Sequence, residues 1–229
     1  MDAGNETRLQ PLMMSFDVFG TLISVRDSSY AAFESILSEA GGANVDVKKF
    51  WERWEHRNIE HYWEPYQPYR KICETSLTET FAEFGLQGSG RLIDRYFEAF
   101  PKFFLYDDVL PTLERLAKTY KLAIVSNIDD DLLAATPLSR EFDLVCTAER
   151  ARGYKPDGTL FKYLLEKSGL TKDQLFHSGQ SQFTDLVGGK PLGLTIAWIN
   201  RRNIALSESV PPPDYVLSDI QSLHRIVQM

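Results

Sequence analysis

Residues 12–21 read LMMSFDVFGT, a short apolar run that ends in Gly20-Thr21. A run of this length and composition predicts a fully buried β-strand over Leu12–Phe19, followed at once by a tight turn. Asp17 places a carboxyl group near the end of this strand. A single aspartate at such a position is more often a turn-former than a nucleophile, so the rest of the chain must decide its role.

Comparable apolar runs recur along the chain, at Leu122–Val125, Leu144–Cys146, Leu175–Phe176 and Leu194–Ile199. Between them, Leu110–Lys118 and Leu160–Ser168 carry apolar residues at spacings of three and four, which is typical of helices that cover a sheet. Strands that alternate with helices predict an α/β fold whose core is a Rossmann-like parallel sheet. Tyr215–Leu217, which follows Pro211–Pro213, is predicted to add an edge strand.

Ser28–Phe104 differs from the flanking sequence because helical periodicity runs through it and no convincing strand is present. Capping and breaking residues divide it into four predicted helices, Ser28–Ala40, Asp46–Trp63, Gln67–Phe84 and Ser89–Phe100. Four helices between the first two strands of a sheet predict a separate cap. We therefore expect a discontinuous core of residues 1–24 and 105–229, and a helical cap of residues 25–104 hinged near Ser24–Asp27 and Leu105–Asp108.

Composition excludes several classes of function. The chain of 229 residues has 25 Lys and Arg against 32 Asp and Glu, a net charge of −7, and no basic patch, so nucleic acid is not an expected partner. No apolar run approaches the ~18 residues that a membrane span needs. Cys73 and Cys146 lack metal-binding or disulfide spacing. The Met1–Gln10 segment lacks the pattern of a secretory signal, which predicts a cytoplasmic protein.

Polar side chains follow several predicted strands at the point where each strand ends. Asp17 and Thr21 follow the first, Ser126-Asn127 the second, Lys155 comes in the loop after Cys146, and Ser178 to Asp185 follow the fourth. The carboxyl ends of parallel strands open into one crevice, where reactive groups of open α/β sheets gather. Several such coincidences favour an active site that contains Asp17.

Four segments carry a resemblance to a known family. They are Phe16–Leu22 (FDVFGTL), Val125–Asn127 (VSN), Tyr154–Asp157 (YKPD) and Gly179–Asp185 (GQSQFTD). In this order they resemble the four motifs of the haloacid dehalogenase (HAD) superfamily of hydrolases. The resemblance covers nearly the whole chain, and it implies a HAD-like core with the helical insertion as a mobile cap that closes over the site.

The resemblance also implies roles for the motif residues. Asp17 would attack the substrate and form a covalent ester, which water near Ser178 and Asp185 would hydrolyse. Lys155 would keep Asp17 ionised and offset its charge. Ser126 and Asn127 would donate hydrogen bonds to the substrate. Thr21 would form a hydrogen bond near Asp17. For Ser126-Asn127, capping of a helix over Asp129–Ala135 is a second, compatible role.

Two positions distinguish the reactions that this superfamily performs. HAD phosphatases have an acid two residues after the nucleophile, whereas this chain has Phe19, and a halide needs no acid in order to leave. Phosphatases also commonly have an aspartate that binds magnesium where this chain has Gln180. The pattern is closest to the L-2-haloacid dehalogenases of type II. It predicts displacement of halide from a short 2-haloacid without a metal or other cofactor.

Three other functions remain open at this stage. One is a magnesium-dependent HAD phosphatase of a small phosphate ester. Another is a related hydrolase that opens a C–N bond, such as an azetidine-2-carboxylate hydrolase, and the last is a non-catalytic binding protein with this fold. The expected partner is a small anionic molecule, with neither nucleic acid nor membrane, and a homodimer is left open.

The cap departs from the dehalogenase pattern where the substrate carboxylate should bind. The resemblance implies an arginine there, but the aligned residue is Glu55, so Arg57 or Arg53 is expected to replace it. Their i, i+4 spacing puts both on one helical face, where solvated surface charges are an equal alternative. Aromatic residues follow nearby, and a few are expected to line an apolar pocket over Asp17 together with Phe19 and Gln180; they are Trp51, Trp54, Tyr62, Trp63, Tyr66 and Tyr69.

Overall fold

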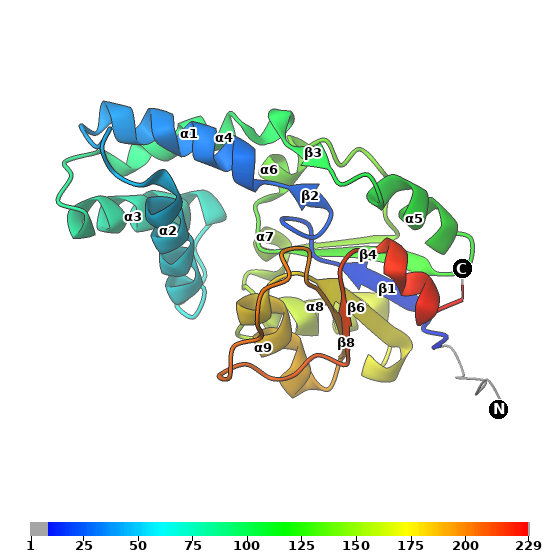
Figure 1. Cartoon of the computed structure of the whole chain (residues 1–229). Helices are drawn as coiled ribbons and strands as arrows, with labels where there is room; N and C mark the ends of the chain where they lie inside the picture. Colours follow the sequence, from blue (N-terminus) through cyan, green and yellow to red (C-terminus); the bar gives the residue numbers. More distant parts are fainter. Residues whose placement is uncertain (1–8, 229) are drawn as a thin grey trace.

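A six-stranded parallel sheet forms the core of the computed structural model, which describes residues 9–228 (Figure 1). The spatial order of the strands is β5-β4-β1-β6-β7-β8. The strands are β1 (Met13–Phe16), β4 (Lys121–Ser126), β5 (Leu144–Thr147), β6 (Leu175–Gly179), β7 (Thr195–Ile199) and β8 (Tyr215–Leu217). The predicted parallel α/β fold and the predicted edge strand are confirmed. Because β1 lies inside the sheet, the residue that follows it has a strand on either side.

Helices cover both faces of this sheet, as alternating side chains of the strands require. Met14 and Phe16 of β1 belong to the apolar cluster that also contains α5 (Val109–Leu116), whereas Met13 packs with α8 (Thr159–Ser168) on the opposite face. The remaining short helices and turns of the core are α6 (Asp130–Ala134), α7 (Ala148–Ala151), α9 (Val187–Gly189), and the helical turns Lys172–Gln174, Gln182–Leu186, Lys190–Leu192 and Gln221–Arg225.

Helices fill the segment between β1 and β4, and none of its described residues 25–103 enters the six-stranded sheet. They are α1 (Arg26–Glu39), α2 (Val47–His61), α3 (Tyr69–Glu83) and the short α4 (Asp94–Phe97). Asp46 caps the amino end of α2 as predicted, because its carboxylate accepts hydrogen bonds from the Lys48 and Lys49 N–H groups. The helices form a separate lobe beside the sheet (Figure 1).

The fourth predicted helix is wrong as a continuous helix. Ser89–Phe100 contains 3-10 turns at Gly90–Ile93 and from Phe100, with only α4 between them. Phe97, Phe100 and Phe103 are all buried, and their spacing of three matches the three residues per turn of a 3-10 helix. Packing of these rings therefore sets the local geometry in place of a regular α-helix.

Two adjacent chain segments join the helical lobe to the core. Strand β2 (Ile23–Ser24) pairs antiparallel with β3 (Phe104–Leu105), so the outgoing and returning segments lie side by side. Arg201, in the loop after β7, binds both connecting segments. Its Nε donates to the Thr21 carbonyl oxygen at 2.9 Å, and its two terminal nitrogens donate to the Asp108 carboxylate at 3.0 Å each.

Strand β1 ends earlier than predicted, at Phe16, because the chain turns immediately after it. The Val18 carbonyl oxygen accepts hydrogen bonds from the Leu22 and Ile23 N–H groups. Gly20 has φ +82°, a backbone conformation that side chains with a Cβ disfavour. The turn thus lifts Asp17 and Val18 out of the strand and directs the following residues toward the cap.

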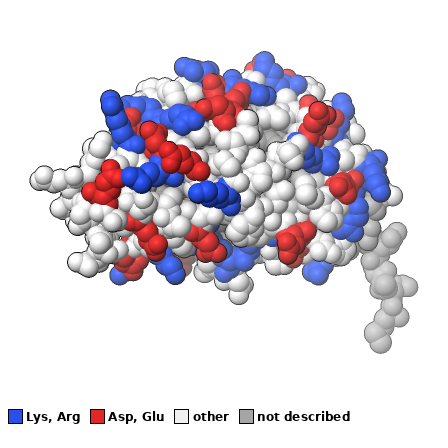
Figure 2. All heavy atoms as spheres, turned by 90° about the horizontal axis from the view of Figure 1, so that it is seen from above, with Lys and Arg blue, Asp and Glu red and all other residues white. Residues whose placement is uncertain are grey.

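Charges of both signs alternate over the face of the molecule seen in Figure 2. No helix within residues 9–228 is both long enough and apolar enough to cross a membrane. The prediction of a cytoplasmic protein depended on the first ten residues, of which 1–8 lie outside the described part of the chain.

Candidate active site

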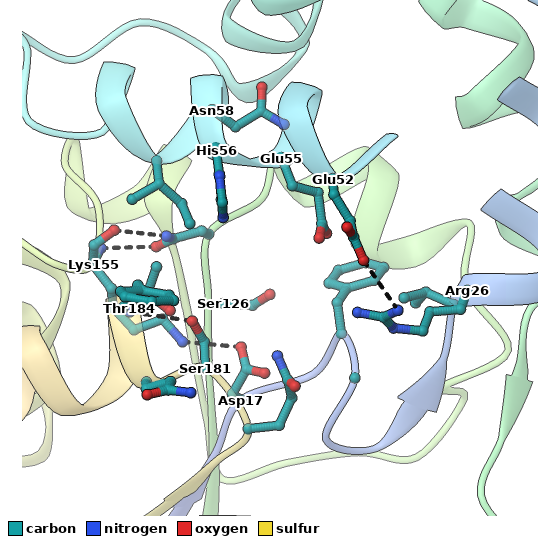
Figure 3. Close-up of a pocket in the computed structure, with 18 of the residues that line it drawn as sticks. Asp17, Arg26, Glu52, Glu55, His56, Asn58, Ser126, Lys155, Ser181 and Thr184 are labelled. Carbon is teal, nitrogen blue, oxygen red and sulfur yellow. Dashed lines mark hydrogen bonds and ion pairs between the residues drawn. The ribbon is translucent and has the colours of Figure 1, made fainter. Parts of the chain in front are cut away.

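The carboxyl ends of neighbouring strands bring the predicted reactive side chains to one edge of the sheet. Asp17 follows β1, Ser126 ends β4 and Gly179 ends β6. The register pairs Phe16 with Ser178, and the Asp17 N–H donates to the Ser178 carbonyl oxygen at 3.0 Å. Asp17 therefore lies at the centre of this edge, close to Lys155 and Ser126 (Figure 3).

Two carboxylates share one buried ammonium group. Lys155 Nζ donates to Asp17 Oδ1 at 2.9 Å, to Asp185 Oδ1 at 2.6 Å and to the Val125 carbonyl oxygen at 2.9 Å. The side chains of Lys155 and Asp185 are 1% and 0% exposed, whereas that of Asp17 is 11% exposed. Asp17 is consequently the carboxylate of the pair that an incoming molecule can reach.

These charges shift one another's pKa values. Burial raises the pKa of Asp17; Lys155 opposes this rise and Asp185 adds to it. Burial acts on Asp185 in the same direction, but Lys155 and a hydrogen bond from His177 outweigh it and lower the pKa of Asp185 to about 2. Burial alone would lower the pKa of Lys155, yet attraction to Asp17 and Asp185 raises it. Asp17 is thus the more basic carboxylate of the pair.

Hydrogen bonds hold the Asp17 carboxylate and the Lys155 loop in place. Thr21 Oγ1 donates to Asp17 Oδ2 at 2.8 Å and accepts from the Gln180 N–H at 2.9 Å. Each oxygen of Asp17 therefore holds one bond, which orients the group and leaves further lone pairs free. The Asn127 side chain donates to the Lys155 carbonyl oxygen at 2.7 Å and accepts from the Lys155 N–H at 2.8 Å.

Further polar contacts, made by His177 and Ser181, position the Asp185 carboxylate. His177 Nε2 lies 3.2 Å from Asp185 Oδ1, and the Ser181 N–H donates to Asp185 Oδ2 at 3.0 Å. His177 Nδ1 in turn lies 2.9 Å from Ser15 Oγ. A Cβ at position 179 would collide with the Asp185 carboxylate, so Gly179 allows the close approach of this group to the strand.

A cavity of about 360 Å³ lies between this sheet edge and helix α2. That volume is in the range of sites for small molecules. On the core side it is lined by Asp17, Phe19, Ser126, Asn127, Lys155 and Gln180. Helix α2 supplies Glu52, Glu55, His56 and Asn58, of which Glu55 and His56 point toward Asp17 (Figure 3). Ser126 projects into the space between Asp17 and these α2 side chains (Figure 3).

A sequence model of one protein family, described as haloacid dehalogenase-like hydrolase, matches residues 14–199. The match runs from the strand that precedes Asp17, through the inserted helices, to the end of β7. The protein belongs to this hydrolase family.

Individual relatives of this HAD-like hydrolase are distant but extend over nearly the same length. (S)-2-haloacid dehalogenase 4A of Burkholderia cepacia is 24% identical over 216 residues, which cover 90% of this chain and 87% of the relative. The L-2-haloacid dehalogenase of Xanthobacter autotrophicus with chloropropionic acid covalently bound has a TM-score of 0.76 and 22% identity, covering 94% of this chain and 97% of its own.

A third relative, the HAD-hydrolase YfnB of Bacillus subtilis bound to magnesium, has a TM-score of 0.77 and 18% identity over 96% of this chain and 100% of its own. At these identities the solved structures show a common fold. The reaction of this chain has to be argued from its own residues.

Most of the predicted site residues of the hydrolase lie in or directly behind the cavity. Thr21, Ser178 and Asp185 are fully buried beneath it. The hydroxyl oxygens of Ser126 and Ser178 are buried and have no hydrogen-bond partner among the described residues. The Asn127 side chain differs from the expectation, because its amide is occupied by the backbone of Lys155 and positions that residue.

The structure does not bring Arg53 and Arg57 to the cavity, contrary to the expected role in binding the substrate. Arg53 donates to Glu83 at 2.6 Å and to Glu60 at 3.0 Å, and Arg57 pairs with the same two glutamates. The two arginines do share one face of α2, as their spacing predicted. That face packs against acidic residues of α3, so their charges are already compensated there.

Two other arginines line the cavity and were missed by the sequence analysis. Arg26 begins α1, next to β2, and Arg202 follows the end of β7. The carboxyl-end rule that located Ser126 also applies to Arg202, so this residue could have been found. Of the aromatic residues named above, Trp51, Tyr62 and Tyr69 line the cavity, whereas Trp63 is 58% exposed.

Proposed function

We propose that this hydrolase displaces halide from carbon 2 of a short 2-haloacid, with Asp17 as the nucleophile. The observation that supports this most directly is the environment of Asp17: a buried, basic carboxylate that faces the cavity with Phe19 beside it. Phe19 packs against Phe100 and Phe103, with ring centroids 5.5 and 6.4 Å apart, so its ring adds an apolar wall. No proton donor comes from that position, and a halide leaves without one.

In the first step an oxygen of Asp17 attacks carbon 2 of the substrate from the side opposite the halogen. A C–O bond forms, the carbon–halogen bond breaks, and the halide leaves with the bonding electron pair. The apolar wall and the helical lobe beside the cavity limit the access of water to Asp17, which strengthens a carboxylate nucleophile. Lys155 holds Asp17 ionised up to the moment of attack and then retains Asp185 as its partner.

In the second step water attacks the carbonyl carbon of the Asp17 ester. The oxygen of this water ends in the Asp17 carboxylate. One of its protons passes to the alkoxide oxygen that Asp17 first supplied, the other goes to solvent, and the 2-hydroxy acid leaves. Lys155 and the Ser178 hydroxyl lie beneath the ester and supply donors for the oxyanion that forms. Asp185 keeps Lys155 charged throughout this step.

The substrate carboxylate needs cationic or hydrogen-bonding groups that are free within the cavity. Ser126 offers an unpartnered hydroxyl close to Asp17. Arg202 offers a guanidinium group on the same cavity, and its pKa is lowered by burial and by the neighbouring charge of Arg26. An added carboxylate would relieve that repulsion between the arginines, which favours binding of an anion between them.

The test is a release assay on the purified protein with 2-chloropropionate, 2-chlorobutanoate and fluoroacetate, with 4-nitrophenyl phosphate as a phosphate-ester control. We expect chloride release from at least one 2-chloro acid and no phosphate release. The Asp17→Asn variant keeps nearly the same shape but is a much weaker nucleophile, so it should lose turnover while its circular dichroism spectrum stays unchanged.

Release of phosphate that depends on Asp17, without release of any halide, would overturn the proposal in favour of a phosphatase. Opening of azetidine-2-carboxylate without halide release would instead favour the C–N hydrolase. Halide release that persists in Asp17→Asn would show that another group performs the displacement.

A further inference from the structure

Glu55 is a cavity carboxylate that the proposed reaction does not use. It projects from α2 into the cavity, on the side opposite Asp17 (Figure 3). Its carboxylate forms no hydrogen bond or ion pair within residues 9–228, although Arg26 and Arg202 are near enough to lower its pKa. Its neighbour Glu52 differs, because it lies 3.9 Å from Arg26 and is 55% exposed. Glu55 is thus an unpaired acidic group that faces the space where a substrate must bind.

Partial burial makes an unpaired charge at this position costly. It raises the pKa of Glu55 to about 7, against the lowering effect of Arg26 and Arg202. A carboxylate in this state gains free energy when a cation enters the cavity beside it, because the cation restores the stabilisation that water would otherwise provide. A carboxylate placed directly beside Glu55 would instead be repelled by it.

Aromatic rings surround the same space. Trp51, Tyr62, Tyr69, Tyr96 and Tyr106 all line the cavity together with Glu55. The faces of aromatic rings attract cations, and two of these rings already do so: the Arg26 guanidinium lies 5.2 Å from the Trp51 ring centroid, and the Arg201 guanidinium lies 3.9 Å from the Tyr106 ring centroid. A ligand cation beside Glu55 would therefore enter a cavity whose aromatic rings are already in contact with cationic groups.

The distribution of charge in the cavity fits a molecule with both signs of charge. Arg202 and Ser126 can take a carboxylate, whereas Glu55 and the rings favour a positive group. Arg26 is partly satisfied by the Tyr30 hydroxyl at 2.9 Å and by Glu52. A zwitterion with a few carbon atoms between its charges uses all of these groups.

We propose that the cavity binds a substrate that carries a positively charged nitrogen in addition to its carboxylate, and that Glu55 recognises this nitrogen. The inference rests on the proposed function, in which the same molecule presents its reactive carbon to Asp17. It makes the preferred substrate a zwitterionic 2-substituted acid, and Glu55 a residue that determines specificity.

Binding of unreactive ligands tests this without turnover. Isothermal calorimetry should compare 4-aminobutanoate, which carries an ammonium group, with pentanoate, which has a methyl group in its place. We expect the wild-type protein to bind 4-aminobutanoate about tenfold or more tightly than pentanoate, the range for a charge-assisted hydrogen bond. The Glu55→Gln variant should lose this preference.

Glu60→Gln is the matched control, because it removes the same charge from the outer face of the same helix. It should keep the wild-type preference. Equal binding of the two ligands, tighter binding of pentanoate, or no binding of 4-aminobutanoate by the wild-type protein would each overturn the inference. So would a preference that survives in Glu55→Gln.

Chloride release from 2-chloropropionate, measured in parallel, separates this inference from the proposed function. Release without any preference for 4-aminobutanoate would retain the displacement reaction and refute the role of Glu55. A preference that depends on Glu55, without halide release from 2-chloropropionate or from the zwitterionic 2-chloro-4-(trimethylammonio)butanoate, would support the cation site and refute the displacement.

Discussion

Replacement of Lys155 by methionine removes the ammonium group that two buried carboxylates share, while keeping a side chain of similar length. Asp17 and Asp185 would then face each other without a cation between them. We expect the pKa of Asp17 to rise further, so that the acidic limb of the pH profile of kcat/KM moves to higher pH. The variant should lose activity at pH 7 and recover part of it at pH 9.

The distance sets the magnitude of this effect. Lys155 Nζ lies 2.9 Å from Asp17 Oδ1, and an opposite charge at such a distance lowers a carboxyl pKa by about 1 to 3 units. At 1.36 kcal/mol per unit, its removal costs about 1.4 to 4 kcal/mol in the ionisation of Asp17. Breaking a buried ion pair also lowers the free energy of unfolding, by about 3 to 5 kcal/mol. Protonation of a carboxyl relieves this loss, so it should be smaller at pH 5 than at pH 8.

The assay is the pH dependence of halide release, together with urea unfolding at pH 5 and pH 8. Lys190→Met is the control, because Lys190 makes an equally short contact, 2.6 Å to Asp214, away from the cavity. A less buried pair of this kind is worth about 1 kcal/mol or less. A folded Lys155→Met protein with the wild-type acidic limb would refute the argument that Lys155 keeps Asp17 ionised.

Two further predictions concern the metal and the cavity arginines. Halide release should persist in excess EDTA, because the reaction proposed for Asp17 uses no metal; loss of activity that magnesium restores would favour the phosphatase. Arg202→Ala should raise KM for a 2-haloacid by roughly five- to thirtyfold, or about 1 to 2 kcal/mol, whereas Arg57→Ala should leave KM unchanged because Arg57 pairs with acidic residues outside the cavity. Steady-state kinetics decide this, and the reverse pattern would restore the role first expected of Arg57.

The part of the site that lies on the core could be predicted from the sequence. Asp17 follows β1, Ser126 ends β4 and Lys155 lies in the segment after β5 and α7, and parallel topology alone brings such positions together at the carboxyl edge of the sheet. The same logic would have identified Arg202. These predictions needed only the order of the elements and not their exact ends.

The part of the site that lies on the cap could not be predicted in the same way. Helical spacing showed that Arg53 and Arg57 share a face of α2, but not which neighbour covers that face. The glutamates that pair with them include Glu83 of α3, thirty residues from Arg53 in sequence. Whether a helix face meets the core or another helix depends on tertiary packing, which a periodicity does not contain.

Contacts between the helical lobe and the core could not be predicted from the sequence either. Asp129, at the start of α6, has no capping bond within its own helix. Its carboxylate instead accepts hydrogen bonds from the Tyr69 and Arg70 N–H groups at 2.8 and 3.0 Å, at the amino end of α3. The carboxylate of one lobe thus caps a helix of the other, a pairing across sixty residues that no local capping rule reveals.

The most direct test of the account is a single turnover in water enriched in oxygen-18, with the protein in excess over 2-chloropropionate. Trypsin should release the peptide Leu9–Arg26, in which Asp17 is the only acidic side chain, so mass spectrometry can assign the label without ambiguity. If water cleaves an Asp17 ester at its carbonyl carbon, oxygen-18 appears in the Asp17 carboxylate and the hydroxy acid formed is unlabelled. Oxygen-18 in the hydroxy acid and none in Asp17 would show that water attacks the substrate directly, which contradicts Asp17 as the nucleophile.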